Sequence, residues 1–366
     1  MKVIIAGGGT GGHLFPGIAL AESIIKRYQD ARIVFVGTQK GLEAKVIPRI
    51  GYELRFISIK GFIGKALGDK AKSLWSLAKS MSESKKIIDS FSPDIVFGVG
   101  GYASLPLVLM ASFKKVPSII LEQNTVPGLA NKILGKVASA IAITYPETVE
   151  HFPREKVYLT GTPIRKRILE GDREKAKELF NLEEGRITVL VFGGSLGARR
   201  INKAMTDALS YLVPLKNSIQ IIHQTGEADY NWVLAEYRNL SFKTTVIPFI
   251  YDMPEAYSWA DLIICRAGAS TVAEITALGK ASILVPYPYA AYNHQEMNAR
   301  RLLSRGACEL ILDREINGEI LAKKINRILN NPEIRREMEM VSRAFGKSNA
   351  GEKIIEIAES LLRRKQ

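Results

Sequence analysis

The chain has 366 residues, of which 46% are hydrophobic and 24% are charged, and its net charge is +14. This length fits two globular cores better than one, the composition excludes a disordered chain, and two cysteines exclude a disulfide-rich protein. The positive charge suits a phosphorylated substrate or an anionic membrane surface, and nucleic acid ranks last because no nucleic-acid-binding motif occurs.

The first predicted strand, Val3–Ala6, leads directly into a glycine-rich turn, Gly7-Gly8-Gly9-Thr10-Gly11-Gly12-His13. Glycine lets the backbone approach a ligand closely, and the helix that follows offers N–H groups to an anion. The turn also matches the G-x-G-x-x-G dinucleotide pattern, but the next strand, Ile33–Val36, does not end in the acidic residue that NAD requires. No P-loop motif occurs either, and we expect no cofactor.

His13 is predicted to lie at the helix N-terminus that follows this turn. It would either pack there or act as a general base on an acceptor hydroxyl, and the phosphate-type loop favours the base.

The segment from Lys60 to Lys86 interleaves apolar side chains with seven lysines, against Asp69 and Glu83. It could be an ordinary amphipathic helix that packs on the core. We favour an exposed apolar patch ringed by lysines that rests on anionic lipid headgroups. The predicted membrane patch consists of Phe62, Ile63, Lys65, Lys70, Lys72, Trp75 and Lys79.

Short apolar runs alternate with helical patterns along both halves, which predicts an α/β fold with doubly wound parallel sheets. Further strands are expected at Ile95–Val99, Ser118–Leu121, Ala140–Ile143, Thr188–Phe192, Ile219–His223, Thr245–Ile247, Leu262–Cys265 and Ser282–Val285, with helices at Pro16–Tyr28 and Leu105–Phe113. A hinge is predicted at Thr160–Arg165, and the chain beyond Pro332 is expected to be helical to its end.

The second half repeats the glycine turns of the first. Gly193–Arg199 is the counterpart of the first turn, and Arg266–Thr271 is the counterpart of the turn at Gly100-Gly101-Tyr102. Two domains facing each other across a cleft, each with two helix N-termini at that cleft, would suit transfer between two substrates.

Two further groups follow in the second half. Glu274 falls in the second turn of its predicted helix, where it is either a solvated surface residue or a bidentate ligand of ribose hydroxyls. The polar run Tyr292–Asn298 is either a surface loop or a source of donors to sugar hydroxyls. No Asp-x-Asp pair occurs, so a leaving diphosphate would need helix dipoles, backbone N–H groups and a cation, for which Arg165 is the candidate.

Taken together, these motifs resemble the GT-B glycosyltransferases that add N-acetylglucosamine to the undecaprenyl-linked muramoyl-pentapeptide of peptidoglycan synthesis. The resemblance covers essentially the whole chain. It rests on Gly8–His13 with Phe15-Pro16-Gly17, Gly100-Gly101-Tyr102, Glu122-Gln123-Asn124, Gly193-Gly194-Ser195 with Gly197-Ala198-Arg199, and Asn298-Ala299.

The resemblance implies an inverting, metal-independent transfer from UDP-N-acetylglucosamine. Residues 1–162 with a final helix at 345–366 would form the acceptor-binding, membrane-associating domain, and residues 163–344 would bind the donor. Leu121 stands where the family often has histidine, which leaves His13 or Glu122 as the base. The implied substrate-binding residues are Thr10, Gly11, Gly12, Asn124, Arg165, Ser195, Ile250 (reading uracil), Ala269, Ser270, Glu274, His294 and Gln295, with acceptor loops at Gly100, Gly101 and Tyr102.

The resemblance also implies a peripheral protein at the cytoplasmic face of the inner membrane, with a cell-wall synthesis complex as a further partner. Other readings stay open: a diacylglycerol glycosyltransferase, a UDP-sugar epimerase, or a non-catalytic membrane-peripheral module that binds a UDP-sugar. A dehydrogenase is the most distant of them.

Overall fold

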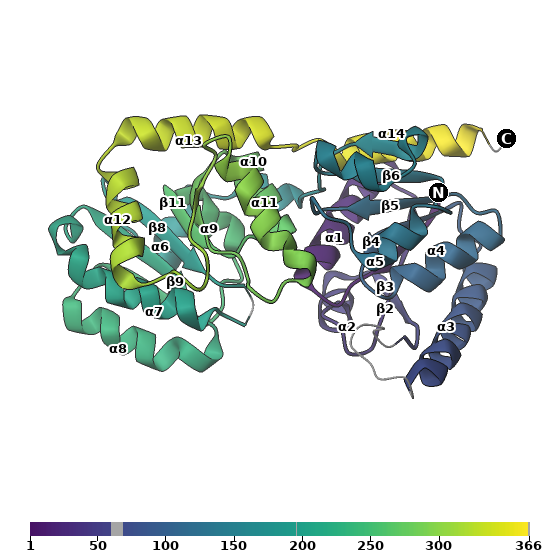
Figure 1. Cartoon of the computed structure of the whole chain (residues 1–366), viewed down its shortest axis with the longest axis horizontal. Helices are drawn as coiled ribbons and strands as arrows, with labels where there is room; N and C mark the ends of the chain where they lie inside the picture. The colour runs from purple at the N-terminus through teal and green to yellow at the C-terminus, as the bar shows by residue number, and fades with distance from the viewer. Residues whose placement is uncertain (60–68, 195, 365–366) are drawn as a thin grey trace. The chain divides into compact units, whose positions relative to one another are not determined.

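The computed structural model describes residues 1–59, 69–194 and 196–364, with side chains from residue 76 onward in the helix that begins at Asp69. The chain forms two compact units, Met1–Arg165 together with Lys347–Gln366, and Lys166–Gly346 (Figure 1). The sequence-based division fell at 162/163 and 344/345, a few residues from these boundaries.

The first unit is built on a parallel sheet with the strand order β3-β2-β1-β4-β5-β6-β7. Its strands are β1 (Lys2–Gly7), β2 (Arg32–Gly37), β3 (Glu53–Phe56), β4 (Ile95–Gly100), β5 (Ser118–Glu122), β6 (Ala140–Ile143) and β7 (Val157–Leu159). Its helices are α1 (Gly11–Arg27), α2 (Glu43–Val46), α3 (Asp69–Phe91), α4 (Ser104–Phe113), α5 (Leu129–Leu134) and α14 (Ala350–Arg363), with short 3₁₀ turns η1 (Pro48–Ile50), η2 (Pro146–His151) and η3 (Arg154–Lys156).

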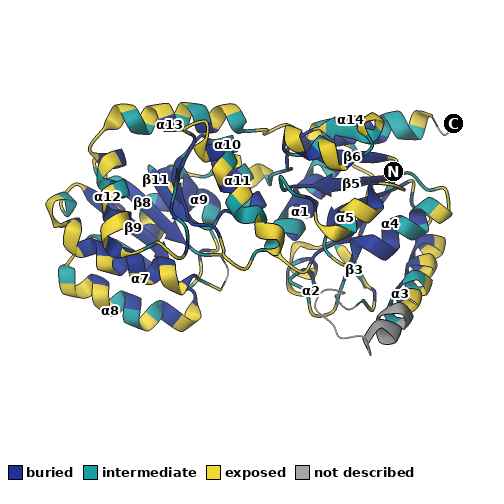
Figure 2. Ribbon diagram, viewed as in Figure 1, coloured by how far each residue is buried: buried dark blue, intermediate teal, exposed yellow. Residues whose placement is uncertain are grey.

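Alternate residues of β1 pack into two separate hydrophobic cores, one on each face of the sheet. Val3 and Ile5 of β1 face the core that α1 and α14 complete, whereas Ile4 and Ala6 face the core that α3 and α4 complete. A strand covered on both faces has to be apolar throughout, which is why β1 and β4 were recognisable as short continuous apolar runs. Figure 2 shows these strands buried and the outer sides of the helices exposed.

The second unit has a parallel sheet with the order β10-β9-β8-β11-β12-β13. Its strands are β8 (Ile187–Phe192), β9 (Ile219–Gln224), β10 (Thr244–Ile247), β11 (Leu262–Cys265), β12 (Ala281–Leu284) and β13 (Glu309–Leu310). Its helices are α6 (Arg173–Phe180), α7 (Arg199–Ala208), α8 (Tyr230–Leu240), α9 (Met253–Trp259), α10 (Ala269–Leu278), α11 (His294–Leu303), α12 (Gly318–Leu329) and α13 (Pro332–Phe345), with 3₁₀ turns η4 (Lys166–Glu170), η5 (Leu209–Tyr211), η6 (Val213–Leu215), η7 (Glu227–Asp229) and η8 (Ala291–Asn293).

The predicted α/β class with two doubly wound parallel sheets is confirmed. Two details of the helices differ from the prediction. Helix α1 begins at Gly11 rather than at Pro16, so Pro16 lies inside the helix and has no N–H to donate to the carbonyl of Gly12. The C-terminal segment is two helices, α13 and α14, which are separated at Gly346. A Cβ atom on Gly346 would lie 2.7 Å from the carbonyl oxygen of Thr276, so this break is tightly packed.

Both cysteines are buried and unpaired, as expected for small core side chains. In the part of the chain that the structure describes, no helix has the length and the apolar character needed to cross a membrane.

Candidate functional site

Each sheet has one point at which the strand order reverses direction. In the first unit it lies between β1 and β4, and in the second between β8 and β11. Loops at the carboxyl ends of these strands diverge there, and open α/β sheets bind their ligands at such points. All four predicted glycine turns follow these four strands, so the structure assigns each unit one candidate site.

In the first unit, the turn after β1 lies against the turn after β4. The N–H of Gly8 donates to the carbonyl of Gly100 at 3.3 Å. Gly100 has φ = +97°, and a Cβ atom there would lie 2.9 Å from Nε2 of His13. The imidazole therefore packs directly on the backbone of the second turn, and the turn needs glycine at that position. His13 Nδ1 lies 3.4 Å from Oγ1 of Thr10, and the ring stays partly exposed.

The other predicted residues of this turn lie beside the imidazole along the chain. Gly11 and Gly12 open α1, and Thr10 precedes the helix. Tyr102, which follows Gly101, is 43% exposed. The structure thus brings together His13, Gly100 and Gly101, and it leaves Tyr102 at the surface next to them.

A buried carboxylate that sequence reasoning missed holds the first turn. Glu43 is 1% exposed and accepts from the N–H of Gly9 at 2.7 Å and from the N–H and hydroxyl of Thr38 at 2.7 and 2.9 Å. It thereby joins the turn after β1 to the turn after β2. Gly8 packs so closely on this carboxylate that a Cβ atom would clash with it.

Glu122 lies at the end of β5 and is 2% exposed. Burial raises the pKa of its carboxyl group, an effect that four N–H donors oppose. One oxygen accepts from the backbone and side chain of Asn124 at 3.0 and 3.2 Å, and the other from Gly128 at 3.3 Å and from Asn131 at 2.8 Å. Both oxygens are thus engaged within the unit, and their effect is to fix the loop that carries Asn124.

Arg165, the predicted cation, stacks on an aromatic ring of α1. Its guanidinium carbon is 4.5 Å from the centroid of the Phe15 ring, a distance typical of a cation–π contact. Phe15 in turn packs on Gly11, where a Cβ atom would lie 3.0 Å from the ring. The stack places Arg165 beside the helix turn that carries His13.

Most of the predicted membrane patch is outside what the structure describes. Phe62, Ile63 and Lys65 lie outside the described residues, and Lys70, Lys72 and Trp75 are described by their backbone alone, within α3. Lys79 is half exposed on α3 and lies 3.9 Å from the carboxylate of Glu83.

A second apolar and basic surface, which sequence reasoning missed, lies on α5 and the turn that follows it. Leu129, Ile133 and Val137 recur every four residues and are all exposed, with Lys132 and Lys136 exposed beside them. We call these five residues the α5 surface. Helix α4 packs against α5 and ends in Phe113, whose side chain is 78% exposed.

In the second unit, the turn after β8 is held by a glutamine. Gln224 donates to the carbonyl of Gly194 at 2.8 Å and accepts from the N–H of Ile250 at 2.9 Å. The candidate phosphate loop and the candidate uracil-reading residue are therefore joined by one side chain, which sequence reasoning did not single out. Ser195 lies outside the described residues.

The second turn of this unit opens α10. Ala269 and Ser270 occupy its first turn, at the N-terminus that would face an anion. Glu274 lies one turn further on and is buried, so it is not a solvated surface residue. Its Oε2 accepts from the hydroxyl of Tyr257 on α9 at 3.1 Å.

His294 and Gln295 begin α11, after the loop that follows β12. Nδ1 of His294 lies 2.7 Å from the carbonyl oxygen of Ala291, and Oε1 of Gln295 accepts from the N–H of Tyr287 at 2.9 Å. Both side chains thus shape the loop 287–293 in this structure.

Arg266, the first residue of this predicted turn, has a role that the sequence pattern did not indicate. It follows β11 immediately and is bound to Asp313 at 2.5 Å, while it also donates to the carbonyl groups of Val285 and Pro286. It ties together the carboxyl ends of neighbouring strands beside α10. Among the described residues, no group of three or more His, Cys, Asp or Glu side chains could hold a metal ion.

Two family models match this chain. The glycosyltransferase family 28 N-terminal domain matches residues 3–143, and the glycosyltransferase family 28 C-terminal domain matches residues 188–356.

Two full-length relatives carry the same name. A protein of Thermodesulfovibrio yellowstonii, called UDP-N-acetylglucosamine–N-acetylmuramyl-(pentapeptide) pyrophosphoryl-undecaprenol N-acetylglucosamine transferase, is 80% identical over 366 residues, which is 100% of both chains. A protein of the same name from Myxococcus xanthus is 43% identical over 99% of this chain and 93% of its own.

Solved structures agree on the fold. The crystal structure of MurG from Acinetobacter baumannii matches with a TM-score of 0.76 and 29% identity over 98% of this chain and 99% of that one. The UDP-GlcNAc 2-epimerase of Neisseria meningitidis matches with a TM-score of 0.70, but at 14% identity over 97% and 99% of the two chains it shares the fold alone.

Proposed function

This chain belongs to glycosyltransferase family 28, and from that premise we propose that it transfers N-acetylglucosamine from UDP-N-acetylglucosamine to the C4 hydroxyl of undecaprenyl-pyrophosphoryl-N-acetylmuramoyl-pentapeptide. The observation that carries the proposal is the 80% identity, over the full length of both chains, to a transferase named for this reaction. The product would feed peptidoglycan synthesis, and through it cell shape and division.

The second unit binds the donor in this proposal. The N-terminus of α10, at Ala269 and Ser270, and the turn that holds Ser195 would receive the diphosphate, because unpaired N–H groups and the helix dipole favour an anion. Glu274 would hold the ribose. Since Gln224 already accepts from the N–H of Ile250, Ile250 would read uracil through its carbonyl. His294 and Gln295 would contact the sugar.

The first unit binds the acceptor, at the turns that hold Thr10, Gly11, Gly12, Gly100, Gly101 and Tyr102. His13 is the general base: it is partly exposed, and it is fixed against Gly100. Glu122 has both oxygens engaged by N–H donors, so we assign it the positioning of Asn124 rather than proton transfer.

The reaction is an in-line displacement with inversion. His13 takes the proton of the acceptor hydroxyl as its oxygen bonds to the anomeric carbon. The bond from that carbon to the diphosphate breaks, and UDP leaves with the electron pair. Arg165, together with the helix N-termini, stabilises the charge that develops on the leaving group, so the proposed transfer needs no metal ion.

The acceptor is a lipid, so the enzyme would work as a peripheral protein on an anionic membrane, at the cytoplasmic face of the inner membrane. The α5 surface supports this proposal because its apolar side chains are exposed and flanked by lysines, the combination that binds anionic headgroups. A cell-wall synthesis complex would be a further partner there.

The test is UDP release from UDP-N-acetylglucosamine, with and without the lipid-linked muramoyl-pentapeptide, in the presence of a chelator. Release that requires the acceptor and persists with the chelator is the expected result. If the chelator abolishes UDP release, the proposed metal independence is refuted, but the proposed transfer reaction is not. UDP release without any acceptor would indicate a hydrolase, and conversion of the UDP-sugar without UDP release would indicate an epimerase. Transfer to diacylglycerol would replace the proposed acceptor.

A further inference from the structure

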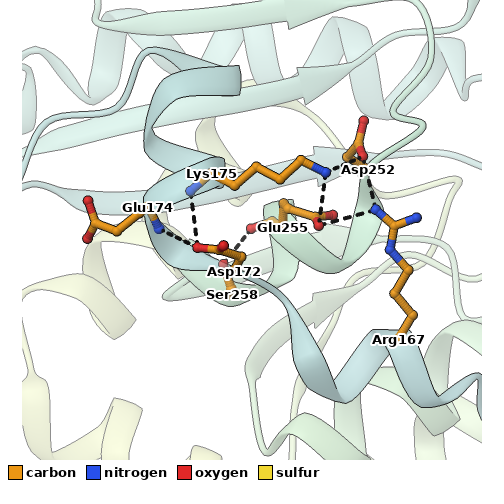
Figure 3. A network of polar contacts seen from close by, with 7 residues as sticks. All are labelled: Arg167, Asp172, Glu174, Lys175, Asp252, Glu255 and Ser258. Atoms are coloured by element: carbon orange, nitrogen blue, oxygen red, sulfur yellow. Dashed lines mark hydrogen bonds and ion pairs between the residues drawn. The ribbon is translucent and has the colours of Figure 1, made fainter.

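Helix α9 contacts α6 and η4 with one side, and Phe192 of β8 and Glu274 of α10 with the other. The side of α9 that packs on α6 and η4 carries Glu255, which is 4% exposed and bound by Arg167 at 3.3 Å and by Lys175 at 3.5 Å. The same two cations bind Asp252, the residue before the helix, each at 3.2 Å. Figure 3 shows both cations converging on the two carboxylates.

A second anchor holds the end of α9. The indole N–H of Trp259 donates to the carbonyl of Arg173 at 2.6 Å, and the guanidinium of Arg173 lies 4.5 Å from the indole ring. The helix is therefore fixed at both ends to α6 and η4, which limits where its remaining side chains can lie.

The inner side of α9 presents Tyr257, which is 1% exposed. Its ring meets the ring of Phe192 edge-on, with centroids 6.1 Å apart, and Phe192 is the last residue of β8 before the glycine turn. Its hydroxyl donates to Oε2 of Glu274 at 3.1 Å. The tyrosine thus joins the strand of the first turn to the carboxylate on the helix of the second turn.

We propose that Tyr257 is a positioning residue for Glu274, and that it thereby sets the preference of the site for ribose over 2′-deoxyribose. A carboxylate can accept about four hydrogen bonds, so the bond from Tyr257 leaves acceptor capacity for sugar hydroxyls. It also selects one orientation of a side chain that has three rotatable bonds. This inference rests on the proposed donor site, in which Glu274 faces the ribose.

The test measures the binding of UDP and of 2′-deoxy-UDP to the full-length chain by titration calorimetry. The ratio of the two dissociation constants reports the contact with the 2′-hydroxyl, and it does not depend on the acceptor or on turnover. Tyr257→Phe keeps the ring and its contact with Phe192. We expect it to reduce the preference for UDP about fivefold, the usual effect of losing one hydrogen bond. Glu274→Gln should reduce the preference for UDP more than Tyr257→Phe does. The double variant should show the same preference as Glu274→Gln alone.

Tyr237→Phe is the matched control. Tyr237 is also fully buried in this unit, and its hydroxyl donates to Nδ1 of His223 at 2.9 Å. Loss of the Tyr237 hydroxyl group should lower thermal stability and leave the ratio of the two dissociation constants unchanged. In the transfer assay, Tyr257→Phe should raise KM for the donor while kcat stays within about twofold, because the reacting carbon lies beyond the diphosphate.

The outcomes separate the two proposals. A wild-type ratio in Tyr257→Phe, with a reduced ratio in Glu274→Gln, overturns the positioning role and leaves the donor site standing. A wild-type ratio in both variants overturns the inference together with the ribose role of Glu274. Calorimetry reports the affinity of the folded fraction separately from its amount, so partial unfolding of a variant does not obscure the result.

Discussion

Glu122 and Asn124 are bound to each other twice: one carboxylate oxygen of Glu122 accepts from the backbone N–H of Asn124 at 3.0 Å and from its side-chain amide at 3.2 Å. The carboxylate thus sets both the path of the loop and the orientation of the amide that follows β5. The same group accepts from Asn131 on α5, so the loop is fixed at two points.

Glu122→Gln is expected to destabilise the protein and to weaken use of the donor sugar, which the family resemblance assigns to Asn124. The amide keeps the shape but turns an NH₂ group toward N–H donors, and losing hydrogen bonds to a charged group costs about 2–3 kcal/mol. Urea unfolding measures the stability, and KM for UDP-N-acetylglucosamine should rise. If that KM and kcat both match the wild type in the folded variant, the loop has no part in binding the sugar.

His13→Ala should reduce kcat by about 10²–10⁴-fold, the usual contribution of a general base. Affinity for the donor should remain, because the imidazole belongs to the first unit. Rapid-quench turnover with saturating substrates checks the first expectation, and calorimetry with UDP-N-acetylglucosamine checks the second. Near wild-type turnover would remove His13 from the mechanism and return Glu122 to consideration as the base.

Membrane binding should respond to charge reversal in the predicted membrane patch. At about 1 kcal/mol for each lysine near an anionic surface, replacing four lysines by glutamate should weaken binding to phosphatidylglycerol vesicles by at least 10²-fold. The four positions are Lys65, Lys70, Lys72 and Lys79. Ile133→Asp on the α5 surface should weaken binding further, measured by vesicle sedimentation.

The control for that experiment reverses four exposed cations of the second unit and so changes the net charge equally. These are Lys203, Arg314, Lys323 and Arg336. Equal losses from both quadruple variants would show a general charge effect in place of a membrane patch, and unchanged binding by the first variant would rule the patch out.

His223 should make stability fall in acid. Burial lowers its pKa to about 3. Asn202 donates through its amide nitrogen to Thr225 and Asp229, so its oxygen accepts from Nε2 of His223 and Nδ1 accepts from Tyr237. The folded state thus needs the neutral ring, whereas the unfolded chain takes up a proton below about pH 6.5.

The unfolded state therefore binds more protons between about pH 6.5 and pH 3, and this one residue should remove about 1.4 kcal/mol of unfolding free energy for each pH unit of descent through that window. Urea titrations at pH 7 and pH 5 measure the difference. His223→Gln should flatten the slope, whereas His151→Gln, at an exposed site of the first unit, should leave it unchanged. An unaltered slope in His223→Gln would refute the assignment.

Sequence patterns predicted the central strands because strands covered on both faces must be continuously apolar. They missed β3 and β7, which are short edge strands with half-exposed side chains, and β13, which has two residues. In the same way, the glycine turns were visible because positive φ angles and close backbone approach require glycine.

The residues that hold those turns were not visible in the sequence. Glu43 lies 34 positions from Gly9, and Gln224 lies 30 positions from Gly194. Nothing local distinguishes them from other polar side chains, since their role depends on which strand ends the sheet order brings together. Tyr257 was hidden for the same reason, because its partner Glu274 lies on a different helix.

The place of α14 has a consequence for how the protein is made. Ile354 and Ile355 of this last helix are buried in the core that Val3 and Ile5 begin, and Tyr28 on the C-terminal side of α1 donates to Glu359 at 2.6 Å. The first unit to leave the ribosome therefore lacks one side of its core until α14 has been synthesised. The second unit is a continuous stretch of chain, Lys166–Gly346, and can complete its fold earlier. The first unit is thus synthesised first but completes its fold last. Until α14 is in place, one apolar face of the N-terminal sheet stays uncovered in the nascent chain.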